Sequence, residues 1–243
     1  LPDEVEHLMP DYSLYGIDYS MGFLTRGCIR RCPWCLVPKK EGDIKLWSPL
    51  KEFLHPAHEK VMLLDNNLLA HPDHPDLLME LVERGVQVCF TQGLDIRLVD
   101  DENAKLLRWV KYRDTKFRRP RLYFSFDTLE IEDDVVRGVE TLKRHGIPPR
   151  HLLFYMLCGF RVRREEYTWD YFMEHDWRRF EVLTKMGCMP FVMKWNGRND
   201  IPLLNAFAKW VNFTHQAKKK SLGLLESFKS YLKHRYRWWS DVS

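Results

Sequence analysis

Three cysteines lie close together in the sequence, at a spacing that suits an iron-sulfur cluster. Cys28, Cys32 and Cys35 form the pattern Cys-x-x-x-Cys-x-x-Cys within one short segment. Three thiolates from one loop can bind three irons of a four-iron, four-sulfur cubane, which leaves the fourth iron open to a small molecule. A structural zinc ion normally takes four ligands from two separated pairs. The spacing therefore predicts a [4Fe-4S] cluster that is held by three protein ligands.

A zinc site is the alternative for these cysteines. It would need a fourth ligand from a distant histidine, and the candidates are His55, His58, His71 and His74. No second cysteine pair follows at zinc-binding spacing, so the sequence favours the cluster. The other cysteines are widely separated, which argues against an auxiliary cluster; Cys89 and Cys188 are expected to be buried, and Cys158 lies near a predicted strand end.

The cysteine motif resembles the signature of the radical S-adenosylmethionine (radical SAM) enzymes. Trp34 fills the aromatic position before the third cysteine, and residues 22–27 resemble the short first strand that delivers the loop. The resemblance implies that S-adenosylmethionine (SAM) binds the open iron through its methionine amine and carboxylate. It also implies that the reduced cluster cleaves SAM to a 5′-deoxyadenosyl radical. The Arg-Gly-Cys entry at residues 26–28 is similar to the cobalamin-dependent and methylthiotransferase branches of the family.

Short apolar runs alternate with helical stretches after the cysteine motif, which is typical of βα units and a parallel sheet. Besides the strand before Cys28, strands are predicted at 60–64, 86–91, 121–126, 151–157 and 189–194. Helices are predicted at 74–84, 101–111, 132–145, 168–186 and 201–213. Six such units match the barrel of the radical SAM family. The predicted fold is therefore α/β, a partial (β/α)6 TIM-type barrel.

Polar residues follow several predicted strands, at the end where the functional groups of parallel barrels gather. Asp65, Asn66 and Asn67 follow the second strand, where the family has a motif that is often Gly-Gly-Glu. The resemblance implies that Asp65 pairs with the methionine ammonium of SAM and that one of the asparagines assists. The alternative is an Asx turn that caps the next segment.

Further SAM contacts are expected at the ends of the later strands. The candidates are Gln92, Ser125, Asp127, Gly159 and Met193. Polar groups among them suit the ribose and the carboxylate of SAM, with Arg97 as a further carboxylate partner, and Gln92, Asp95 and Asp127 equally suit a substrate. At Gly159 the missing Cβ would let the backbone approach the nucleoside. No residue is assigned to the reaction on the substrate.

The net charge of +4 is unevenly distributed along the 243 residues. Residues 209–243 hold eight lysines and arginines against two acids, and residues 111–121 hold six against one. Lysines and aromatic residues interleave between 218 and 237, which permits binding of single-stranded nucleic acid. Apolar residues also recur there at helical spacing, namely Leu222, Leu225, Phe228, Tyr231 and Leu232. An amphipathic helix that packs on the core is therefore the favoured interpretation.

The chain is expected to contain one core domain with short extensions. Residues 19–214 are predicted to form the core, which a chain with 45% hydrophobic residues can bury, and residues 215–243 form a basic, aromatic extension. Residues 1–18 form either an ordinary extension or a linker, because residues 9–15 resemble the segment that joins a cobalamin-binding-type domain to the radical SAM core. Neither a secretory signal nor a membrane span is visible, so a cytoplasmic protein without membrane contact is expected.

The sequence therefore predicts a radical SAM enzyme, an oxidoreductase or a transferase. Its cofactors would be the [4Fe-4S] cluster and SAM, and its partners a reductant such as a flavodoxin or ferredoxin and a substrate that is a small molecule, an RNA or a peptide. The alternative from another class is a metal-braced nucleic-acid-binding module without radical chemistry.

Overall fold

The computed structural model describes residues 2–197, 199–214 and 223–236. The chain divides into two compact units. The first unit comprises Leu1–Ser125 and Asp133–Leu153, and the second comprises Phe126–Glu132 and Phe154–Ser243.

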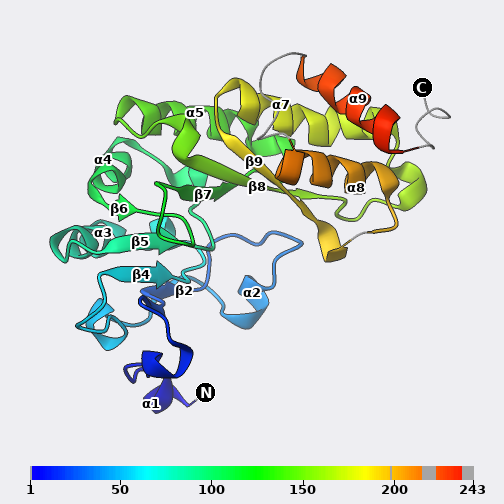
Figure 1. Ribbon diagram of the computed structural model, residues 1–243. Coiled ribbons are helices and arrows are strands. Elements are labelled where there is room, and N and C mark those ends of the chain that lie inside the picture. Colours follow the sequence, from blue (N-terminus) through cyan, green and yellow to red (C-terminus); the bar gives the residue numbers. More distant parts are fainter. Residues whose placement is uncertain (1, 198, 215–222, 237–243) are drawn as a thin grey trace. The chain divides into compact units, whose positions relative to one another are not determined.

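The first unit is built on four parallel strands in the order β1-β4-β5-β6 (Figure 1). These strands are β1 (Ser20–Gly22), β4 (Lys60–Leu63), β5 (Gln87–Phe90) and β6 (Lys111–Tyr112). A separate antiparallel ribbon joins β2 (Thr25–Arg26) to β3 (Lys45–Leu46). The last strand of this unit, β7 (Leu122–Ser125), forms a parallel bridge from Phe124 to Leu94. Because the strands of the four-stranded sheet are parallel, the segments that follow them all begin on the side of the sheet where the strands have their carboxyl ends.

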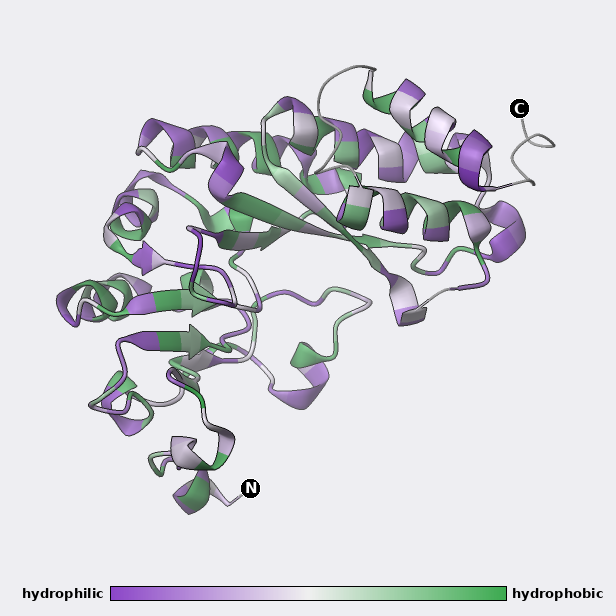
Figure 2. Cartoon of the chain, in the orientation of Figure 1, coloured by the Kyte–Doolittle hydropathy of each residue, from purple (hydrophilic) through white to green (hydrophobic). Residues whose placement is uncertain are grey.

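Apolar side chains hold this sheet to its helices. Figure 2 shows that β4 and β5 are polar at their first residue and hydrophobic toward their carboxyl ends. The helices are α3 (His74–Glu83), α4 (Asp101–Trp109) and α5 (Glu132–Arg144), preceded by the short α1 (Asp3–Glu6) and α2 (Val37–Lys40). Each long helix buries one apolar stripe, as Leu78 and Leu81 do in α3. A capping box between Asp100 and Asn103 fixes the start of α4.

The second unit has an aromatic core. Its strands are β8 (Leu152–Cys158), from Phe154 onward, and β9 (Met189–Lys194). Its helices are α6 (Trp169–Tyr171), a π-helical segment (Phe172–Trp177), α7 (Arg178–Lys185), α8 (Pro202–Lys209), a second π-helical segment (Trp210–Thr214) and α9 (Leu224–Arg235). Six buried rings pack together: Phe172, Trp177, Phe180, Phe207, Trp210 and Phe228.

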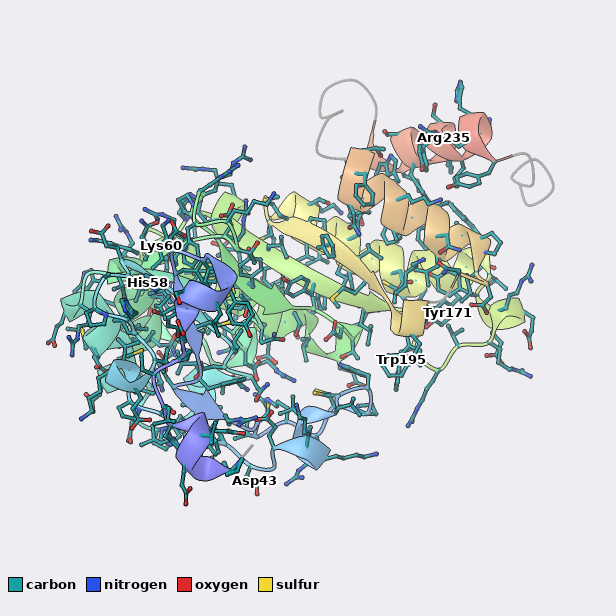
Figure 3. All side chains as sticks on the ribbon, turned by 60° about the horizontal axis from the view of Figure 1, so that its bottom comes forward. Asp43, His58, Lys60, Tyr171, Trp195 and Arg235 are labelled. Atoms are coloured by element: carbon teal, nitrogen blue, oxygen red, sulfur yellow. The ribbon has the colours of Figure 1, made fainter. Side chains whose placement is uncertain are left out.

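The amphipathic interpretation of the C-terminal helix is confirmed for the described residues. Phe228 and Leu232 of α9 are fully buried, and Phe228 stacks on Trp177 with ring centroids 5.9 Å apart. The cationic Arg235 is exposed at the end of the same helix (Figure 3). The basic and aromatic positions at 218–222 and 237–239 lie outside the described residues.

The predicted α/β class with parallel strands is confirmed, and every predicted strand from residue 60 onward has a counterpart. The strands of the described residues do not form one closed sheet, so the barrel stays a prediction. The prediction of one strand at 22–27 was wrong. The chain leaves the sheet after Gly22, because the backbone N–H groups of Leu24 and Thr25 bond to a side chain, Asp65, instead of a neighbouring strand.

The predicted helix at 168–186 is present but changes pitch in its middle, where residues 172–177 are π-helical. The two-residue strand β6 was not predicted. No helix in the described ranges is long and apolar enough to cross a membrane.

Candidate functional site

The loop that carries the cysteines begins with a tight backbone approach. Gly27 has φ +86°, and a Cβ at this position would lie 2.1 Å from the carbonyl oxygen of Asp43. Only glycine fits both this conformation and this contact. The next residue, Cys28, donates its backbone N–H to the carbonyl oxygen of Gly42 at 3.2 Å. The loop is thus closed on itself before the first cysteine.

None of the three cysteines of the loop is in a disulfide, and all three are partly exposed. Cys35 donates its backbone N–H to the carbonyl oxygen of Cys32 at 3.0 Å, which folds the second half of the motif into a turn. The Cys28 sulfur accepts from the backbone N–H of Arg30 at 3.3 Å. N–H groups aimed at a sulfur stabilise the thiolate, which is the form that binds metal.

Three consecutive residues after β4 fasten the loop. Asp65 accepts from the backbone N–H groups of Thr25 (2.5 Å) and Leu24 (3.2 Å) and from the Thr25 hydroxyl (2.8 Å). Asn66 accepts from the backbone N–H of Gly27 at 3.2 Å. The Asn67 amide donates to the sulfur of Cys28 at 3.5 Å. The polar run that the sequence placed at a strand end therefore holds the polypeptide that leads to the first cysteine.

Asp65 is 4% exposed, and this burial raises its pKa to about 6 against the opposing effect of its hydrogen bonds. Both of its oxygens already have partners in the chain, across some forty residues of sequence. These contacts are not the Asx turn that was the alternative. They also compete with the predicted pairing of Asp65 with the SAM ammonium, which stays a prediction.

Among the three polar residues after β4, Asn67 has a buried side-chain oxygen that accepts no hydrogen bond from the described residues. Its side-chain NH2 group donates to Cys28 and, at 3.4 Å, to the Asp95 carboxylate. Its oxygen is buried and has no hydrogen-bond partner in the described part of the chain. A buried acceptor without a donor costs about 1–3 kcal/mol. The position therefore suits a ligand that brings an N–H group to the side of Cys28.

Asp95 joins the cysteine loop to the end of β5. It accepts from Arg30 Nε at 2.8 Å and from Arg97 Nε and Nη2 at 2.7 and 3.0 Å. Burial opposes ionisation of this carboxyl group, but the two guanidinium groups hold its pKa below the usual range. Arg97, predicted as a partner of the SAM carboxylate, binds both oxygens of Asp95, and its contact with SAM stays a prediction. Arg30 was not predicted, and only its place inside the cysteine motif marked it.

The residues present fit an iron-sulfur cluster in their chemistry. Within the described ranges, no three His, Cys, Asp or Glu side chains form a ready-made metal-binding group. The loop nevertheless supplies three thiols outside disulfides, N–H donors to Cys28, and a cationic neighbour, Arg30. Burial lowers the pKa of Arg97, but the hydrogen bonds and the charge of Asp95, followed by the charge of Cys32, outweigh burial and raise that pKa.

The histidines that a zinc site would need have other partners. His58 shares a hydrogen bond with the Ser20 hydroxyl at 3.0 Å, and His74 with the carbonyl oxygen of His71 at 2.9 Å. Figure 3 shows His58 beside Lys60 at the start of β4, well apart from Asp43, whose carbonyl borders Gly27. His58 therefore lies at the amino end of a strand, whereas the cysteines follow the carboxyl ends.

The other predicted SAM contacts are divided between the two units. Trp34 and Ser125 are half-buried and Gln92 is exposed in the first unit. Asp127, Gly159 and Met193 belong to the second unit. There, Asp127 accepts from the backbone N–H of Leu157 at 2.8 Å, Gly159 is buried with φ +77°, and Met193 is 45% exposed. Their contacts with SAM stay predictions.

A buried ion pair in the second unit was missed from the sequence. Arg179 bonds to Asp176 at 2.5 Å and donates to the carbonyl oxygens of Phe126 (2.7 Å) and Leu157 (3.1 Å). Tyr167 donates its hydroxyl to the same Asp176. The arginine thus ties α7 to the segments that carry Asp127 and the end of β8. Nothing in the local sequence distinguished it from exposed arginines nearby.

Neither a scan against protein-family models nor a search of curated proteins found a match to this chain. Function must therefore be inferred from the residues of the site.

Proposed function

We propose that this protein is a radical SAM enzyme with a partial (β/α)6 barrel, in which Cys28, Cys32 and Cys35 hold a [4Fe-4S] cluster. The observation that carries the proposal is the spacing of three partly exposed cysteines, none of them in a disulfide, on one loop. When bound, the reduced cluster supplies the electron that cleaves SAM to a 5′-deoxyadenosyl radical, which abstracts hydrogen from the substrate. A flavodoxin or ferredoxin of the cytoplasm would supply that electron.

Different residues around the loop would hold the cysteine backbone, bind SAM and balance charge. Asp65 and Asn66 hold the backbone that leads to Cys28. The unpaired Asn67 oxygen would accept a hydrogen bond from the SAM ammonium, because that group needs an acceptor beside the cluster. Arg30 and Arg97 balance the negative charge of Asp95 and of the thiolates. The substrate would be a small molecule, an RNA or a peptide.

The test of the proposal is iron loading of the full chain under anaerobic conditions. We expect about four irons per chain and a brown protein that absorbs broadly near 400 nm. Alanine at Cys28, Cys32 or Cys35 should abolish the cluster. Cys188→Ala is the matched control, because it removes a thiol of the second unit and should leave iron loading unchanged. A colourless protein that holds zinc, or full iron loading in Cys32→Ala, would contradict the proposal.

A further inference from the structure

A cavity of about 410 Å³ lies beside β6, and all the charged residues that line it are basic. The cationic side chains that line it are Arg108, Lys111, Arg113 and Arg150, together with His151. No aspartate or glutamate is among its lining residues. Its volume lies in the range of about 300–1,000 Å³ that is usual for ligand sites. All of these residues belong to the first unit.

The cavity lies toward the amino ends of the strands, whereas the cysteine loop lies toward their carboxyl ends. Lys111 begins β6 and donates its ammonium to the carbonyl oxygen of Gly85, just before β5, at 2.9 Å. His151 directly precedes β8 and shares a 3.0 Å hydrogen bond with the Tyr112 hydroxyl. The cysteines, Asn67 and Asp95 instead follow strands. The cavity is therefore separate from the candidate catalytic site.

No described acid forms an ion pair with Arg108, Lys111, Arg113 or Arg150. Arg108 and Arg150 are exposed, and their guanidinium groups have neither a hydrogen bond nor an ion pair to any described residue. The Arg113 guanidinium donates to the backbone carbonyl oxygen of Tyr112 at 3.0 Å. Burial lowers the pKa of His151, and the nearby arginines, Arg150 first among them, lower it further. The field in the cavity thus disfavours any additional cation and attracts an anion.

The basic surface continues from the cavity onto the loop after β6. Lys116, Arg118 and Arg119 are exposed on this loop. The one acid of the segment, Asp114, is occupied by the backbone N–H groups of Lys116 (3.2 Å) and Arg118 (2.8 Å). The loop therefore adds three cations and one carboxylate, a net charge of +2, to the four cations of the cavity. A single phosphate group cannot engage so many charges, whereas a chain of phosphates can.

We propose that this cavity and the adjoining loop bind the phosphodiester backbone of a single-stranded nucleic acid. The guanidinium forks of Arg108 and Arg150 have the geometry to bind phosphate oxygens. Trp109 lines the same cavity and is 50% exposed, which offers a ring on which one base can stack. The site does not depend on the cysteine loop or on the reaction proposed for it.

The test is a fluorescence-anisotropy titration of the full chain with a labelled single-stranded RNA at several salt concentrations. Arg108→Ala/Arg150→Ala removes two guanidinium groups that have no partner in the described chain, so the fold should be retained, which a thermal melt checks. We expect this variant to bind at least about tenfold more weakly. Its plot of log affinity against log salt should be shallower by about 1.4, because each phosphate contact on a single strand contributes about 0.7 to the slope.

The matched control is Lys39→Ala/Lys51→Ala, which removes the same charge from two exposed lysines that do not line the cavity. It should bind RNA within about twofold of the wild type, as expected for charges that touch no phosphate. An equal loss in both double variants would overturn the proposal in favour of diffuse attraction. Unchanged binding in Arg108→Ala/Arg150→Ala would also overturn it, as would a mononucleotide that competes as well as the unlabelled RNA.

Discussion

Asp65 gives the sharpest prediction, because its burial links the stability of the cysteine loop to pH. The folded carboxyl group has a pKa of about 6, against 3.8 for the unfolded chain. Between these two values the folded state binds a proton that the unfolded state lacks, so the free energy of unfolding falls as pH rises. A difference of about two units corresponds to about 3 kcal/mol that is lost between pH 4 and pH 6 and is constant above that range.

The substitution that isolates this effect is Asp65→Asn. Asparagine keeps the size of the side chain and an acceptor for Thr25, but it cannot accept from Leu24 with its NH2 group, so a constant loss of about 1 kcal/mol is expected at every pH. The pH-dependent part is separate from this offset. Relative to the variant, the wild type should lose about 3 kcal/mol from pH 4 to pH 6.5.

Urea unfolding of both proteins at half-unit steps of pH measures this difference, because every other titrating group is shared and cancels. The two curves of unfolding free energy should converge or cross as pH rises. Parallel curves would refute the reasoning, since Asp65 would then be ionised in the folded state without a penalty for burial.

Three other substitutions test the site and its scaffold. Asn67→Leu removes the unpaired buried oxygen, so calorimetry on the iron-loaded protein should show SAM binding weakened by about 1.5–3 kcal/mol. Unchanged affinity would favour Asp65 as the partner of the SAM ammonium. Gly27→Ala would place a Cβ against the Asp43 carbonyl at a positive φ, so iron loading should fall and stability should drop by at least about 1–3 kcal/mol; normal loading would show that the loop can relax. Arg179→Met leaves Asp176 buried without its cation and should lower the free energy of unfolding in urea by about 3–5 kcal/mol. The loss should be smaller in the double variant that also carries Asp176→Leu. A double variant in which the two losses add would contradict the role of the ion pair.

The fold could be predicted where local patterns decide it. The apolar runs of β4, β5, β7, β8 and β9 and the stripes of the helices were sufficient for the α/β class and for the parallel strands. The short strand β6 has only two residues, too few for any period to appear. The break after Gly22 depends on Asp65, which is distant in sequence and captures the backbone that a strand would otherwise use. The division into two compact units had no signature in composition.

The candidate site was predictable in its cysteines and only partly in what surrounds them. Spacing alone marks Cys28, Cys32 and Cys35, and position after a strand marks Asp65 and Asn67. The sequence does not report which N–H groups need an acceptor, so the hydrogen bonds of Asp65 to Leu24 and Thr25 could not be predicted. The ion pairs of Arg30 and Arg179 depend likewise on tertiary contacts.

The central claim is that the cysteine loop supports reductive cleavage of SAM. It is tested most directly by reducing the iron-loaded protein with dithionite in the presence of SAM and measuring 5′-deoxyadenosine by chromatography and mass spectrometry. The account predicts 5′-deoxyadenosine from the wild type and none from Cys28→Ala under the same conditions. An iron-loaded, reduced wild-type protein that leaves SAM intact would contradict it.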